Sequence, residues 1–76
     1  MNRLPVESTV LASAAYSTQR SVLELQFLDG TLYLFFDVPA VCFQRLMASD
    51  SKGAYFNRNI RNRFRYQVLT MIRSEN

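Results

Sequence analysis

Alternation of apolar and polar residues predicts three consecutive strands in the first half of the chain. The first strand covers residues 10–16, the second covers residues 22–27, and the third covers residues 31–36. The positions expected on the buried faces of the first two strands are Val10, Ala12, Ala14 and Tyr16, and then Leu23, Leu25 and Phe27. Because short turn-forming segments join these strands, we expect an antiparallel meander.

The connection between the second and third strands decides which face of the third strand is buried. The Asp-Gly pair at positions 29–30 is typical of a hairpin turn. A two-residue turn pairs Leu25 with Leu34 and points Tyr33 and Phe35 away from the core. A three-residue loop pairs Leu25 with Tyr33 and brings both aromatic side chains into the core, because a shift of one residue exchanges the two faces. Both faces are apolar, so the pattern alone leaves the two registers open.

Two short helices are expected after the third strand. Asp37 can cap the first helix and Pro39 can occupy its first turn, and this helix is expected to end near Ser49. Ser51 can cap a second helix that ends near Asn62. The apolar positions expected to face the sheet are Cys42, Phe43, Leu46 and Met47 in the first helix, and Phe56 and Ile60 in the second.

A fourth strand is predicted near the end of the chain. Its alternating positions are Phe64, Tyr66 and Val68 on one face and Arg63, Arg65 and Gln67 on the other. Residues 69–72 either extend this strand or turn helical. The predicted fold class is therefore α+β, a small antiparallel sheet (a three-strand meander plus a fourth strand) with two short helices packed on one face.

Composition narrows the classes of function. The chain of 76 residues is expected to be a single small domain. It has no histidine and a single cysteine, Cys42, which excludes an internal disulfide, histidine-based catalysis and histidine-containing zinc sites. We therefore expect no enzyme, no metal and no cofactor, with Cys42 as a small buried apolar residue. The sequence has neither a membrane-spanning apolar run nor the apolar stretch of a signal peptide, so a cytoplasmic protein that does not contact membranes is expected.

Charge is distributed unevenly along the chain. Residues 51–73 contain six cations and no acid, whereas residues 1–50 contain three arginines and five acids, a net charge of −2. This polarity favours an anionic partner for the second half, and guanidinium groups suit phosphate oxygens. The candidate nucleic-acid-binding residues are Lys52, Asn57, Arg58, Arg61, Arg63 and Arg65. The function expected first is a non-enzymatic binding module for RNA or single-stranded nucleic acid.

Each candidate residue also has a purely structural interpretation. If the second helix continued that far, Arg58, Arg61 and Arg65 would form one stripe, which is either a phosphate-binding ridge or a solvated face. In a strand, Arg63 and Arg65 would point away from the neighbouring aromatic side chains. Asn57 either reads a base edge or bonds to a neighbouring backbone group. Convergence of the arginines on one surface would support nucleic-acid binding, and divergence would weaken it.

The strand at residues 31–36 allows two further interpretations. Tyr33 and Phe35 form either a base-stacking platform on an open sheet face or part of the core. The alternating residues Leu32, Leu34 and Phe36 give the strand a second apolar face. An exposed apolar sheet face predicts the alternative function, a protein–protein interaction module or a homodimer.

A set of residues spread through the chain matches a known domain pattern. These residues are Val6, Ser8, Thr9, Val10 and Tyr16, then Leu23, Leu25, Phe27, Gly30, Tyr33, Phe35, Val38 and Pro39, and then Ser51, Gly53, Tyr55, Phe56, Asn57 and Ile60. Over about residues 6–68 the chain resembles the KTSC domain family, a module found at the end of some lysyl-tRNA synthetases and alone in small bacterial proteins.

This resemblance supports the α+β fold and the three-residue loop. It also implies a link to RNA, because of the association with synthetases, although such appendages bind either tRNA or partner proteins. The sequence departs from the family pattern at Phe35, where a tyrosine is usual, so a hydroxyl group at that position is not essential here. Leu34 stands where relatives often have a polar residue, which indicates an additional hydrophobic contact.

Overall fold

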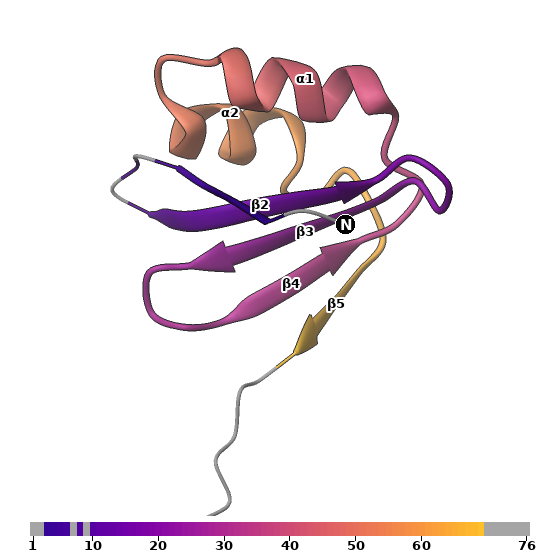
Figure 1. Ribbon diagram of the computed structural model, residues 1–76, viewed down its shortest axis with the longest axis horizontal. Helices are drawn as coiled ribbons and strands as arrows, with labels where there is room; N and C mark the ends of the chain where they lie inside the picture. Colours follow the sequence, from indigo (N-terminus) through magenta and orange to yellow (C-terminus); the bar gives the residue numbers. More distant parts are fainter. Residues whose placement is uncertain (1–2, 7, 9, 70–76) are drawn as a thin grey trace, which may run out of the picture.

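The computed structural model describes residues 3–6, 8 and 10–69. The elements are β1 (Arg3–Pro5), β2 (Leu11–Ser17), β3 (Val22–Phe27), β4 (Leu32–Phe35), α1 (Ala40–Ala48), α2 (Lys52–Asn59) and β5 (Tyr66–Leu69). The strands form one antiparallel sheet in the order β1-β2-β3-β4-β5, and both helices lie on one side of it (Figure 1). The predicted α+β class is confirmed. The strand β1 was not predicted, because its three residues end at Pro5 and show no alternation.

A β-bulge in β2 corrects the predicted first strand. Leu11 pairs with Phe27 and Ser13 pairs with Gln26, so Ala12 is an extra residue on the β2 side. The bulge places Leu11 in the core, with 1% of its surface exposed, whereas Val10 is 39% exposed. The prediction that Val10 and Ala12 face the core was therefore wrong, because strict alternation along β2 is interrupted at this point.

The hairpin between β3 and β4 has the three-residue loop. Leu25 lies opposite Tyr33, and the Phe27 amide donates to the Thr31 carbonyl at 2.9 Å. Gly30 closes the loop with a φ of +93°, in the left-handed region that favours glycine, and its amide donates to the Phe27 carbonyl. This register buries Phe35 and leaves Tyr33 half-buried.

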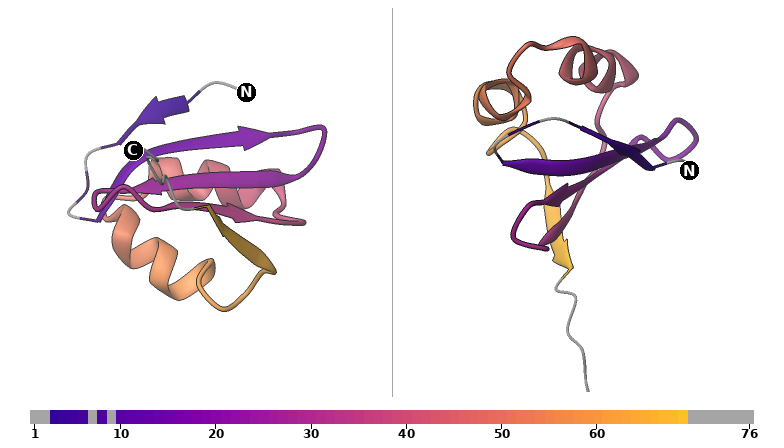
Figure 2. Two further views of the ribbon diagram at one scale, coloured as in Figure 1. Left: turned by 90° about the horizontal axis from the view of Figure 1, so that it is seen from below. Right: turned by 60° about the vertical axis from the view of Figure 1, so that its left-hand side comes forward.

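The core lies between the sheet and the two helices (Figure 2). Cys42 and Leu46 of α1 are buried, as are Phe56 of α2 and Ile60 just after it, so the predicted helix faces are confirmed. The fully or nearly buried apolar residues are Leu11, Ala14, Leu23, Leu25, Phe35, Val38, Cys42, Leu46, Phe56 and Ile60. Burying each of the larger aliphatic side chains contributes on the order of 1.5–3 kcal/mol.

Only one of the predicted helix caps is present in the structure. Ser51 caps α2 as predicted, since its Oγ accepts a hydrogen bond from the Ala54 amide at 3.3 Å. Asp37 does not cap α1, because it adopts a left-handed conformation with a φ of 58°, and Pro39 occupies the N-cap without a side-chain bond. The helix α2 ends at Asn59, earlier than predicted, and the chain then turns back through Asn62, whose φ is 66°.

The last strand forms one edge of the sheet. It begins at Tyr66, three residues after the first predicted position, Arg63. Tyr66 lies opposite Phe35 and Val68 lies opposite Tyr33. The predicted alternation is confirmed for these residues. Leu69 belongs to the strand, and the alternatives for residues 70–72 lie outside the described residues.

Candidate functional site

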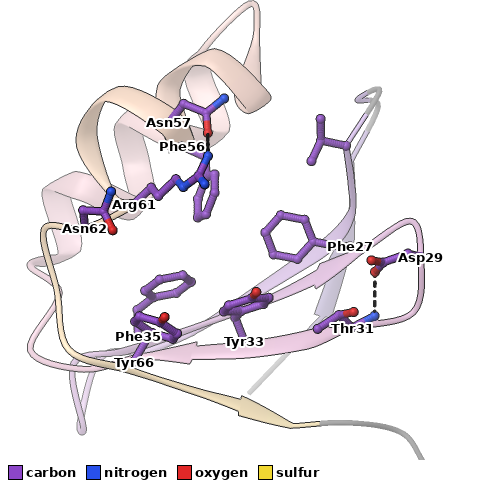
Figure 3. A pocket seen from close by; sticks show the side chains of 11 residues that line it. Phe27, Asp29, Thr31, Tyr33, Phe35, Phe56, Asn57, Arg61, Asn62 and Tyr66 are labelled. Carbon is purple, nitrogen blue, oxygen red and sulfur yellow. Dashed lines mark hydrogen bonds between the residues drawn. The ribbon is translucent and has the colours of Figure 1, made fainter.

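An open groove lies between α2 and the helix-facing side of β3, β4 and β5 (Figure 3). Its volume is about 470 Å³, within the usual range for small-molecule sites. It is lined by Val10, Phe27, Asp29, Thr31, Tyr33, Phe35, Phe56, Asn57, Arg61, Asn62 and Tyr66. Because five of these eleven residues are aromatic, we call it the aromatic groove.

Aromatic side chains of three neighbouring strands form the floor of the aromatic groove. The Tyr33 ring lies at the centre, with its centroid 5.1 Å from that of Phe27, 5.8 Å from that of Phe35 and 5.6 Å from that of Tyr66. The antiparallel register produces this cluster, because directly opposite residues share a face. Tyr66 keeps 50% of its surface exposed, since β5 has no further strand beside it among the described residues.

The wall of the groove comes from α2. The buried ring of Phe56 meets Phe27 at 5.3 Å and Phe35 at 5.7 Å in edge-to-face contacts, which fix the helix against the floor. Asn57 follows Phe56 in the helix, so it projects at the rim rather than into the core.

Polar groups of opposite charge lie at the two ends of the groove. At the α2 end, the Arg61 guanidinium donates from Nη1 to Asn57 Oδ1 at 3.4 Å, and Asn62 lies beside them. At the hairpin end, Asp29 Oδ1 accepts from the Thr31 amide at 2.9 Å. This hydrogen bond holds the pKa of Asp29 below its usual value, so the carboxylate stays charged at neutral pH. The groove therefore has donors at one end, an anion at the other, and rings between them.

The six candidate nucleic-acid-binding residues do not all reach one surface. Asn57 and Arg61 line the aromatic groove. Arg58 lies in a separate depression of about 320 Å³ at the junction of the helices. The side chain of Lys52 is held at the start of α2, since its Nζ donates to the Ser49 carbonyl at 3.1 Å. Arg63 is exposed in the turn before β5.

Arg65 lies on the opposite side of the sheet from the groove. Its guanidinium carbon is 5.0 Å from the centroid of the Phe36 ring, and its Nη2 is 3.9 Å from Asp37 Oδ2. Both charged side chains are largely exposed, so this ion pair adds little stability. Arg65 directly precedes β5, and its carbonyl accepts from the Phe36 amide, so it continues the ladder by one residue and points to the opposite face from Tyr66. The arginines therefore do not form the single stripe that a longer α2 would have produced.

Sequence reasoning missed several lining residues. The pattern predicts Phe27 on the buried face of its strand and Tyr66 on one face of the last strand, and it indicates no binding role for Asp29, Thr31 or Asn62. Tyr66 is the residue that the sequence could have indicated, because an aromatic residue in the last strand of a meander has only one neighbouring strand to cover it. Tyr33 and Phe35, for which two interpretations were open, line the groove while packing on the core.

The remaining face of the sheet, which we call the outer face, has no helix over it (Figure 2). The apolar residues Leu32, Leu34 and Phe36 are half-buried there.

Cys42 is buried in α1, on the helix-covered side of the sheet, and the Tyr55 hydroxyl donates toward its Sγ at 3.9 Å. Desolvation raises the pKa of Tyr55, and the contact with Cys42 adds to this.

Two properties of the described residues bear on other kinds of function. None of the helices in this part of the chain has the length and apolar character required to cross a membrane. The same residues contain no group of three or more cysteine and acidic side chains placed to hold a metal ion.

Comparison with known proteins finds relatives over most of the chain. The family model of the KTSC domain matches residues 7–64. A protein from Tsukamurella paurometabola is 38% identical over 86% of this chain and 97% of its own length. A lysine–tRNA ligase from a Nostoc species is 31% identical over 88% of this chain, which corresponds to 12% of the enzyme.

A solved structure has the same fold. The crystal structure of a KTSC domain protein from Yersinia pestis superposes with a TM-score of 0.85, at 32% identity over 90% of this chain and 96% of the other. Six of the positions that the family pattern covers also line the aromatic groove. They are Val10, Phe27, Tyr33, Phe35, Phe56 and Asn57.

Proposed function

The chain belongs to the KTSC domain family, and we propose that it binds single-stranded RNA by holding an unpaired base in the aromatic groove. One observation carries this proposal: the exposed ring of Tyr66 and the half-buried ring of Tyr33 lie in an open groove opposite the guanidinium of Arg61.

The floor of the groove supports base stacking. Stacking of a base on an aromatic side chain contributes about 1–3 kcal/mol and tolerates every base, since each base has a flat face. A base paired within a duplex does not expose that face, so the groove suits unpaired nucleotides of loops and single strands. Asn57 and Asn62 at the rim add amide groups that can bond to base edges.

The charges around the groove support one phosphate contact at Arg61. Binding to a single strand loses affinity with salt at a log–log slope of about −0.7 for each phosphate neutralised. Four converging arginines would give a slope near −3. Because Arg58 and Arg65 lie elsewhere, we expect a slope of about −0.7 to −1.4 for the groove, the steeper value if Arg63 also reaches the backbone.

The relatives give independent support. The matching lysine–tRNA ligases carry a region similar to this domain, and a small RNA-binding module would help an enzyme of that name hold its tRNA. The alignment with the stand-alone Tsukamurella protein covers 97% of that protein, so the same function must suit a domain that acts without a synthetase.

Fluorescence anisotropy with labelled single-stranded RNA at several salt concentrations tests the proposal. We expect Arg61→Ala and Tyr66→Ala each to weaken binding, with only Arg61→Ala making the salt slope shallower. Arg65→Ala is the matched control, because it removes an equal charge four residues away on the outer face. Absence of binding at about 50 mM salt, where phosphate contacts are strong, would contradict the proposal.

A second candidate function is protein binding through the outer face, which is favoured by the half-buried Leu32, Leu34 and Phe36 in the absence of a covering helix. Sedimentation of the protein alone tests self-association there. A dimer that Leu34→Asp dissociates would support it, and a monomer at all concentrations would exclude the homodimer.

A further inference from the structure

The two edge strands of the sheet, β1 and β5, differ in how readily another chain can pair with them. The edge strand β1 has three residues and ends at Pro5, and a short strand with proline resists pairing with another chain. The other edge strand, β5, consists of Tyr66, Gln67, Val68 and Leu69 and has no charge, proline or glycine. Among the described residues, no strand pairs with its free side.

The backbone groups on this free edge can be assigned from the ladder. The Phe36 amide donates to the Arg65 carbonyl, and residues 36 and 65 continue the register of β4 and β5. In an antiparallel pair, the residues that bond to the partner alternate with residues whose backbone groups point away. The amide and carbonyl groups of Tyr66 and Val68 therefore point toward the free edge. The side chains of the same two residues are 50% and 42% exposed.

We propose that this edge binds an extended acidic peptide of a partner protein, which adds a sixth strand beside β5. Pairing with Tyr66 and Val68 would satisfy four backbone groups, and the added strand would extend the floor of the aromatic groove. Peptide residues directly opposite Tyr66 and Val68 share their face, so apolar side chains are expected there. In the antiparallel orientation, the next peptide residue lies opposite Arg65 on the outer face, where an acidic side chain is expected.

Charge favours this occupant over a second copy of the chain. Residues 51–69 contain five cations and no acid, and Arg63 and Arg65 immediately precede the edge. A second copy would bring the same positive charge.

Amide hydrogen exchange, followed by NMR on the whole protein, tests this proposal. The probe is a short synthetic peptide with valine and tyrosine two positions apart and glutamate directly after the tyrosine. We expect the peptide to slow exchange at the Tyr66 and Val68 amides. A peptide of the same composition with the pattern shifted by one residue should bind more weakly, because it would place the apolar side chains on the wrong face.

Substitutions distinguish the edge from other surfaces. Val68→Pro removes an edge-facing amide and is tolerated by an edge strand, so the fold should persist while peptide affinity falls roughly threefold to tenfold. Arg65→Ala should weaken binding about twofold to fivefold, and Arg20→Ala, in an exposed turn, should not.

Three outcomes would overturn the proposal. The first is a peptide effect confined to Leu32, Leu34 and Phe36. The second is a wild-type dimer that Val68→Pro dissociates, which would assign the edge to a second copy. The third is slowed exchange at Tyr66 and Val68 with RNA but not with any acidic peptide. Because the RNA titration uses Arg61→Ala and this experiment uses Val68→Pro, either proposal can fail without the other.

Discussion

Arg61 lies two residues beyond the end of α2, and its guanidinium donates to the side-chain oxygen of Asn57 in the last turn of that helix at 3.4 Å. Both residues are exposed at the rim of the aromatic groove. The bond engages the side-chain oxygen of Asn57, while the Asn57 amide group and the remaining guanidinium N–H groups of Arg61 stay available as donors to a ligand. A groove with donors on this rim suits phosphate oxygens and the carbonyl groups of bases.

The contact between Asn57 and Arg61 predicts how two substitutions of Asn57 change the affinity for RNA. Asn57→Ala should weaken RNA binding by less than about tenfold, because it removes one hydrogen-bonding group and leaves Arg61 charged. Asn57→Asp should weaken it further, since a carboxylate beside Arg61 competes with phosphate. Anisotropy titrations of both variants measure the difference. Equal affinities would show that Arg61 does not contact the backbone.

The two glycines predict opposite effects on stability. Gly30→Ala should lower the free energy of unfolding by about 1–2 kcal/mol, because a Cβ at a φ of +93° is strained although no atom lies within 4 Å of it. Gly53→Ala should be neutral or stabilising by up to about 1 kcal/mol, because alanine favours the helix and its Cβ would contact Val10 at an ordinary 3.4 Å. Urea denaturation measures both. A larger loss at Gly53 would mean that Val10 cannot accommodate the methyl group.

The cap of α2 predicts a stability change without a change of fold. Ser51→Ala should cost about 1 kcal/mol, since the Ala54 amide loses its acceptor. Ser51→Asp is the control, because a carboxylate can accept the same bond and interacts favourably with the positive end of the helix. Thermal unfolding should rank Ser51→Asp near the wild type and Ser51→Ala below both. An unchanged midpoint for Ser51→Ala would contradict a stabilising role for this bond.

The hairpin loop predicts a pH dependence. The Thr31 amide lowers the pKa of Asp29 in the folded state, so the folded protein binds this proton less readily than the unfolded chain. The resulting stabilisation is fully present above the usual aspartate pKa of about 4 and is lost as pH falls through the lowered value. Denaturation of the wild type and Asp29→Asn from neutral to acidic pH should show their stabilities converging in acid. Parallel curves would exclude the effect.

Local pattern predicted most of the fold and little of the candidate site. The position of the hairpin, both apolar helix faces and the Ser51 cap depend on residues near one another in sequence, and the pattern predicts them. The length of the hairpin loop stayed open, because both faces of the third strand are apolar. The bulge at Ala12 and the left-handed Asp37 were missed, because no neighbouring residue requires them. The aromatic groove depends on the register of β4 with β5, which brings Tyr33 and Tyr66 together across 33 positions of sequence. The number of arginines in the second half of the chain favours an anionic partner, but it does not indicate which arginines share a surface.

The order of the strands in the sheet matches their order in the sequence. Each strand pairs only with its neighbours in sequence, so the sheet can grow in the order in which the chain leaves the ribosome. The buried core is complete at Ile60, whereas Tyr66, the outer margin of the groove floor, is added by the final described strand. A chain that ends before Tyr66 would keep the core residues and lack the groove margin. Folding of the core and completion of the groove therefore depend on different segments of the chain.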